Sequence, residues 1–176
     1  MEHAWKKWVT GYEALDRKKH IEAKALTASE EHEYSYLRNV VSAFLGAKKT
    51  LMEDNRVRTI RVPVALPVIV QDSGMYRTAF TKNISSEGAF IEDERPARIG
   101  EKIELRIFNE RNETTISVRA EVKWRSSDGM GVQFVDVDNE TILKLYELYY
   151  EQLNNAVVIN VGAKLHPTLD VHSMLA

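Results

Sequence analysis

Hydrophobic residues in the first fifty positions recur at helical spacing. Residues 1–50 contain no proline. Apolar side chains three and four residues apart predict a helix over 29–46, and a weaker pattern predicts another helix over about 3–25. Ser29, which acidic residues follow, is expected to cap the later helix at its N-terminus. The apolar positions of that helix are Tyr34, Leu37, Val41, Phe44 and Leu45.

The hydrophobic period changes to two between residues 57 and 135, as is typical of half-buried strands. Alternation is clearest over 62–70, where Pro63 and Pro67 share the opposite face. Because proline cannot donate a ladder hydrogen bond, this strand is expected at a sheet edge or with one face unpaired. Six short strands with regular turns predict a small antiparallel barrel or sandwich. The other candidate strands cover residues 76–81, 89–92, 103–107, 116–124 and 130–134.

A second helical pattern follows the strands. Asp136 or Asp138 is expected to cap a helix over about 138–153, and Asn154-Asn155 is expected to end it. No clear period continues beyond that point. The predicted organisation is an N-terminal helical extension (1–50), a barrel domain with a C-terminal helix (51–154) and a tail of unknown structure (155–176).

The composition excludes several classes of chemistry. The chain has 176 residues and no cysteine, which removes disulfides, thiolate metal ligands, iron–sulfur clusters and thiol catalysis. Its 24 basic and 26 acidic residues give a net charge of −2, so any anion-binding site must be local. No run approaches about 18 apolar residues, and the N-terminus lacks the apolar core of a secretory signal. We therefore expect a cytoplasmic protein without membrane insertion.

Three arginines precede the first predicted strand. Arg56, Arg58 and Arg61 lie close together in an otherwise charge-balanced chain. A guanidinium donates two parallel hydrogen bonds to a phosphate, and the same planar fork fits the O6 and N7 edge of guanine. A local cationic arm for an anionic or purine ligand is one interpretation. A solvated charged linker is the other.

A polar segment lies between two predicted strands, at Asn83–Gly88. Asn83 and Ser85 are two residues apart, so on an extended segment their side chains point the same way. Both side chains donate and accept hydrogen bonds. Gly88 permits a close backbone approach that a Cβ would block. These residues fit a ligand-binding surface or an ordinary polar turn.

Two later segments complete an ordered set of motifs. Val122-Lys123-Trp124 lies on a predicted strand, where Trp124 is expected in the core because large aromatics mainly supply buried area. Gly129–Phe134 follows as the next strand. With Arg61 and Asn83-Ile84-Ser85-Ser86-Glu87-Gly88, these segments resemble the PilZ domain family over residues 55–153. The resemblance implies a mainly β fold, a six-stranded antiparallel barrel with N-terminal helices and a C-terminal helix.

The resemblance also implies a ligand, the bacterial second messenger cyclic di-GMP. Because the arginines lie between the N-terminal helices and the barrel, we expect ligand binding to be relayed to a protein partner. The site residues that the family motifs cover are Arg61, Asn83, Ser85 and Gly88, and we add Arg56 and Arg58 from the same arginine group as predicted ligand-binding residues. We expect no cofactor, bound metal or nucleic-acid polymer. We also expect no enzymatic activity, because no phosphate-binding glycine loop or nucleophile motif is present and all five histidines lie outside the barrel region.

One position departs from the family pattern. The family's arginine motif is Arg-x-x-x-Arg, and Val57 stands four residues before Arg61. Arg56 or Arg58 would have to substitute, although neighbouring residues on an extended arm point to opposite sides. The alternative is a degenerate PilZ-like scaffold that binds no nucleotide and acts by protein–protein interaction in motility or pilus machinery. The helix over 34–45 would then supply a partner or homodimer surface, unless it packs on its own barrel or C-terminal helix.

Overall fold

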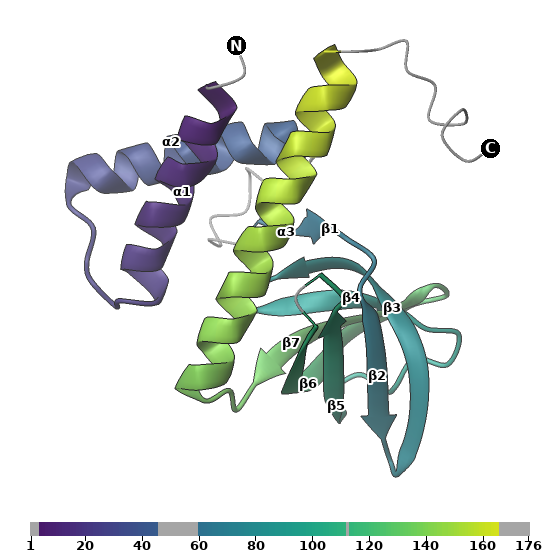
Figure 1. The fold of residues 1–176 in the computed structure, drawn as a ribbon. Coiled ribbons are helices and arrows are strands. Elements are labelled where there is room, and N and C mark those ends of the chain that lie inside the picture. The colour runs from purple at the N-terminus through teal and green to yellow at the C-terminus, as the bar shows by residue number, and fades with distance from the viewer. Residues whose placement is uncertain (1–3, 46–59, 112, 166–176) are drawn as a thin grey trace. The chain divides into compact units, whose positions relative to one another are not determined.

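The computed structural model describes residues 4–45, 60–111 and 113–165 of the chain. These residues belong to two compact units. One unit contains two N-terminal helices and the end of the C-terminal helix from Leu153 onward. The other contains a closed β-sheet and the same C-terminal helix up to Gln152 (Figure 1).

The N-terminal helices form a hairpin of α1 (Ala4–His20) and α2 (Ala28–Phe44). Both predicted helices are confirmed, although α1 is shorter than predicted. The hydroxyl of Thr27 accepts a hydrogen bond from the Glu30 N–H, and the Glu30 carboxylate accepts one from the Thr27 N–H at 2.8 Å. This capping box satisfies two backbone donors that have no partner in the helix. The prediction that Ser29 is the N-cap was therefore wrong by two residues.

The core between α1 and α2 includes a buried carboxylate. Asp16 is fully buried, and its Oδ1 accepts a hydrogen bond from the Tyr34 hydroxyl at 2.7 Å. The Tyr34 ring stacks on Tyr12, with ring centroids 5.5 Å apart. Burial, followed by the charge of Asp16, raises the pKa of Tyr34, so the phenol keeps its proton. The apolar face of α2 is buried, and Leu37 on this face lies next to Gly11 of α1, a partner that the sequence analysis did not weigh.

The strands of the second unit close into a barrel. Within the described residues they are β1 (Val62–Pro63), β2 (Pro67–Asp72), β3 (Met75–Ser85), β4 (Gly88–Glu92), β5 (Lys102–Asn109), β6 (Thr114–Ser126) and β7 (Gly129–Val135). The sheet runs β1-β3-β2-β5-β6-β7-β4, and β4 also pairs with β3. All pairs are antiparallel. The predicted six-stranded antiparallel barrel is therefore confirmed, with the two-residue β1 added to one end of β3.

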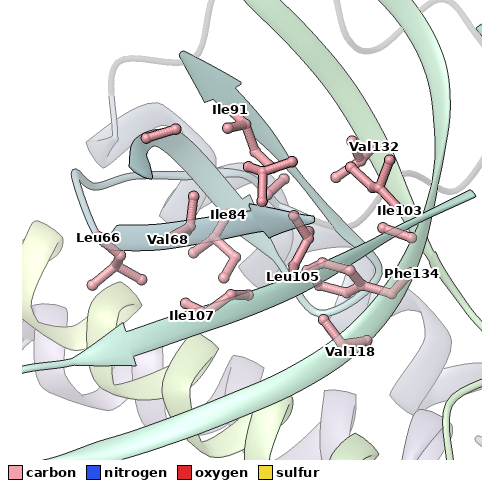
Figure 2. Close-up of a cluster of buried hydrophobic side chains, with 14 of the residues drawn as sticks. Leu66, Val68, Ile84, Ile91, Ile103, Leu105, Ile107, Val118, Val132 and Phe134 are labelled. Carbon is pink, nitrogen blue, oxygen red and sulfur yellow. The ribbon is translucent and has the colours of Figure 1, made fainter. Parts of the chain in front are cut away.

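Alternating apolar side chains fill the barrel interior (Figure 2). Leu105 and Ile107 on β5 show the pattern, because they are at most 1% exposed while the residue between them is exposed. Burial of one such side chain stabilises the fold by about 1.5–3 kcal/mol. The C-terminal helix adds Leu145 and Leu148 to the same core. The labelled core residues are Leu66, Val68, Ile84, Ile91, Ile103, Leu105, Ile107, Val118, Val132 and Phe134.

The first predicted strand is divided into β1 and β2. Its ladder stops between Pro63 and Pro67, neither of which has an N–H to donate. Thr81 on β3 bridges the gap, because its hydroxyl donates to the carbonyl of Val64 at 2.6 Å and accepts from the N–H of Leu66 at 2.9 Å. Since β2 pairs with both β3 and β5, the prediction of a sheet edge is correct for β1 and wrong for β2.

Two irregularities interrupt the alternation, one on β3 and one on β6. The register shifts around Lys82 on β3 and around Lys123 on β6. One extra residue in a strand moves every later side chain to the opposite face of the sheet. Asn83 and Trp124, which follow the two irregularities, consequently lie on the outer face, and both are at least partly exposed.

The C-terminal helix α3 (Asn139–Leu165) is longer than predicted. Asp138, the later of the two predicted caps, accepts a hydrogen bond from the Thr141 N–H at 2.8 Å. The prediction that Asn154-Asn155 ends the helix was wrong. Neither residue removes a backbone donor as proline would, and the apolar residues that follow continue the helix to Leu165.

Candidate functional site

A row of side chains crosses the outer face of four adjacent strands. In register, Asn83 on β3 pairs with Phe90 on β4, Phe90 pairs with Gly131 on β7, and Gly131 pairs with Trp124 on β6. We call these four residues the outer row. Because neighbouring strands lie about 4.8 Å apart, the outer row spans about 14 Å. It therefore combines an amide with two aromatic rings on one surface.

Arg61 lies at the Asn83 end of the outer row. Its Nη1 donates a hydrogen bond to Asn83 Oδ1 at 3.0 Å. The strand β1 begins one residue later, and its Val62 and Pro63 pair with Ile84 and Asn83 of β3, so the sheet ladder holds Arg61 within side-chain reach of Asn83. The structure thus brings together two predicted site residues that are 22 positions apart in the sequence.

Trp124, at the far end of the outer row, stacks on the ring of Phe90, which is buried. Their ring centroids are 5.0 Å apart and their planes meet at 26°. Gly131 lies under the indole, and a Cβ at this position would overlap Trp124 Nε1. Trp124 is 47% exposed, so the prediction that it belongs to the core was wrong. The irregularity at Lys123 turns this residue outward after Val122 has pointed into the barrel.

Ser85 and Gly88 shape the turn next to Asn83. Ser85 is buried, and its Oγ donates to the carbonyl oxygen of Gly88 at 3.2 Å and accepts from the Glu87 N–H at 3.4 Å. Gly88 lies so close to β7 that a Cβ would overlap the carbonyl oxygen of Val132. The predicted close approach at Gly88 therefore exists. In the conformation described, the Ser85 hydroxyl contacts the turn itself.

Two predicted site residues, Arg56 and Arg58, lie outside the described residues. Arg61 is the member of the arginine group that the structure describes. Across the described ranges, no three histidine, aspartate or glutamate side chains gather as a metal ion would require. In the same part of the chain, no helix is both long and apolar enough to cross a membrane.

Lys82 and Phe90 flank the predicted polar segment, but sequence reasoning assigned neither of them a role in the site. The ammonium nitrogen of Lys82 lies 5.8 Å from the centroid of the Phe90 ring. The sequence did indicate where Phe90 points. Ala89 and Ile91 point into the barrel, so the residue between them on the same strand points to the outer face. No comparable signal existed for Lys82, since its position follows from the irregularity in β3.

The barrel and the order of its motifs define the class of protein. A family model described as the PilZ domain matches residues 55–151, more than half of the chain. The chain belongs to the PilZ domain family. The matched range contains Arg61, the outer row and the turn that carries Ser85 and Gly88.

Several solved structures are similar to this chain. The PilZ domain of YcgR from Escherichia coli, solved with c-di-GMP, is 12% identical, with a TM-score of 0.48 and coverage of 58% of this chain and 95% of that one. The PilZ domain of CeSA from a cellulose-synthesising bacterium is 17% identical, with a TM-score of 0.46 and coverage of 52% and 95%. The Bacillus subtilis inhibitor of motility MotI/DgrA is 20% identical, with a TM-score of 0.48 and coverage of 57% and 52%. No curated protein sequence matches the chain.

Proposed function

We propose that this protein is a cytoplasmic receptor for cyclic di-GMP that relays nucleotide binding to a protein partner. The observation that carries the proposal is the Arg61–Asn83 hydrogen bond of 3.0 Å at one end of the outer row, whose other end is the exposed indole of Trp124. Membership of the PilZ family and the ordered motifs also support it. In this proposal the barrel acts as a binding module and not as an enzyme.

Each part of the site has a property that suits a cyclic dinucleotide. The Arg61 guanidinium matches a phosphate or a guanine edge through its planar fork. The Asn83 amide donates and accepts hydrogen bonds, as recognition of a base edge requires. The exposed Trp124 face offers a purine a stacking surface, and stacking on an aromatic side chain is worth about 1–3 kcal/mol per base. Arg56 and Arg58 would supply two further guanidinium groups for the phosphates.

The turn gives Ser85 and Gly88 a supporting role in this proposal. Ser85 bonds to the turn backbone on both its donor and acceptor sides, so it sets the conformation of the segment that follows Asn83. A bound phosphate would compete for the same hydroxyl. Loss of this hydroxyl is therefore expected to weaken binding, either through a lost contact or through a misplaced turn.

The relay is proposed from chain order. The predicted extension (1–50) and the barrel domain (51–154) are joined through the segment that carries Arg56 and Arg58. Holding the arginines of this segment against a ligand would cost conformational entropy, which charge-assisted hydrogen bonds must exceed. Ligand capture would then change the surface that the N-terminal helices offer to a protein partner. The distance between a label on α1 and a label on the barrel should change when cyclic di-GMP binds. An unchanged distance would argue against the relay.

Calorimetric titration of the full chain with cyclic di-GMP tests the binding function. Wild type should bind in the micromolar range, and Arg61→Ala or Asn83→Ala should weaken binding at least about tenfold, as expected for loss of a charge-assisted contact. Ser85→Ala should also weaken it. Arg119→Ala is the matched control, because Arg119 lies on β6 in a long 4.0 Å pair with Glu104. No heat and no thermal shift in the wild type would end the receptor proposal.

A second function is favoured by one residue. Val57 stands where the family carries its first arginine, which suits a scaffold that no longer binds nucleotide. Such a scaffold would act through protein contacts in motility or pilus machinery, with a homodimer through the N-terminal helices as one assembly. Val57→Arg separates the two functions. It should create binding in a chain that lacks it, and it should change little in a chain whose other arginines already bind.

A further inference from the structure

Lys82 occupies the irregular position of β3, directly before Asn83. The register passes from Thr81 to Asn83, so Lys82 has no partner residue on β4. Its side chain is 57% exposed, and its ammonium lies 5.8 Å from the centroid of the Phe90 ring. The irregularity thus places a flexible positive charge over the centre of the outer row.

Lys82 is only weakly held by its acidic neighbour. Its Nζ lies 3.9 Å from Glu92 Oε1, and the two side chains are 57% and 50% exposed. An ion pair this long and this open to solvent contributes little, so release of the ammonium toward another anion costs little. Glu92 is therefore a competitor for Lys82 as well as a negative charge close to the outer row.

We propose that Lys82 binds a phosphate of the ligand that occupies the outer row, and that Glu92 weakens this contact by competing for the ammonium. The inference deepens the proposed function and rests on it. A lysine ammonium is a compact charge on a flexible stem, so it can follow a phosphate without a fixed geometry. Arg61 then acts at the Asn83 end of the row, and Lys82 neutralises charge above Phe90.

Four variants test the inference by titration of the full chain with cyclic di-GMP at low and high ionic strength. Lys82→Ala should raise Kd about tenfold at low ionic strength, the loss expected for one charge-assisted contact. Lys82→Arg should keep most of the affinity. Glu92→Gln should lower Kd about threefold, because it removes the competitor. Each charge effect should shrink at high ionic strength.

Lys144→Ala is the matched control, because this lysine lies on α3 in a 2.6 Å pair with Glu140 and its side chain is similarly exposed. It should leave Kd unchanged. Wild-type binding with an unaltered Kd in Lys82→Ala would overturn this inference alone. Weaker binding in both Lys82→Ala and Glu92→Gln would overturn it too, because it would mean that the ion pair only supports the fold. No binding by the wild type would overturn both this inference and the proposed function.

Discussion

Trp124 stacks on Phe90, with ring centroids 5.0 Å apart, across a glycine on the strand between them. The covered face of the indole lies over Gly131, where a Cβ would overlap Nε1. The indole nevertheless remains 47% exposed. This geometry fixes a large aromatic surface on a rigid sheet, which favours stacking with a planar ligand because little side-chain entropy is lost on binding.

Gly131→Ala should displace the Trp124 indole. The added Cβ would meet the ring itself, so the stack on Phe90 must open, with an expected stability loss of about 1–2 kcal/mol from overpacking. Trp124 fluorescence reports the change directly in a Trp5→Phe, Trp8→Phe background. The emission of the glycine parent and the alanine variant should differ. Identical emission spectra would contradict the geometry of the stack.

Gly88→Ala should destabilise the barrel more strongly. The new Cβ would meet the carbonyl oxygen of Val132, a backbone atom that cannot rotate away. We expect a loss of about 2–3 kcal/mol in the free energy of unfolding. Gly74→Ala is the control, because Gly74 has a positive φ of 83° but open space around it. The control should cost about 1 kcal/mol through backbone strain alone. Urea unfolding of both variants gives the comparison, and equal losses would be inconsistent with a steric cause at Gly88.

Arg77→Met should leave two buried carboxylates without their partner. Arg77 Nε donates to Asp93 at 2.6 Å and its Nη1 donates to Asp72 at 2.7 Å, while its side chain is only 14% exposed. Burial alone would lower the pKa of Arg77, but the hydrogen bonds to Asp93 and Asp72 outweigh it and the net pKa is raised. Removing one partner from such a buried ion-pair group is expected to lower the free energy of unfolding by about 3–5 kcal/mol. Chemical unfolding measures the loss.

The control for this triad is Arg119→Met, which removes an exposed guanidinium from the same barrel. It should change stability by less than about 0.5 kcal/mol. The further change Asp93→Asn in the Arg77→Met chain should recover part of the loss, because it removes one of the unpaired charges. Similar stability of Arg77→Met and Arg119→Met would refute the structural role of the triad.

Glu30 should make the α1–α2 hairpin sensitive to acid. Its hydrogen bond with Lys18 at 2.6 Å, together with those from Thr27, lowers the pKa of Glu30 from 4.5 to about 2. A depressed carboxyl pKa stabilises the folded state above pH 4.5, and this contribution is lost as the pH falls from 4.5 toward 2. Because other carboxylates titrate over the same range, the useful quantity is the difference between wild type and Glu30→Gln.

Thermal midpoints followed by circular dichroism give that difference. The wild type should be the more stable chain at neutral pH, and its advantage over Glu30→Gln should fade between pH 4.5 and 2. Lys18→Met should reduce the same pH dependence, because Lys18 supplies the largest effect on the Glu30 carboxyl. A difference that stays constant over this pH range would contradict the assignment.

Much of this fold was predictable because its signals are local. The period of 3.6 residues placed the helices, and the period of two placed the barrel strands within a few residues. Errors occurred where the deciding partner lies elsewhere in the chain or the local cue is ambiguous. Thr27 displaces Ser29 as the cap because its Glu30 partner completes a capping box. The strand beginning at Val62 is divided at its prolines. The hydroxyl of Thr81 on β3 forms hydrogen bonds with the backbone of Val64 and Leu66 between them.

The sequence alone determined the barrel, the flanking helices and the residue types of the candidate site, because periodicity and ordered motifs are properties of neighbouring positions. Only the tertiary structure decided which of these residues share a surface. The irregularities at Lys82 and Lys123 arise from strand pairing, and each reverses the face of every residue after it. Strict alternation would have turned Asn83 and Trp124 into the barrel. Pairing across β3, β4, β7 and β6 instead placed them at the two ends of one row on the outer face, with Arg61 at the Asn83 end.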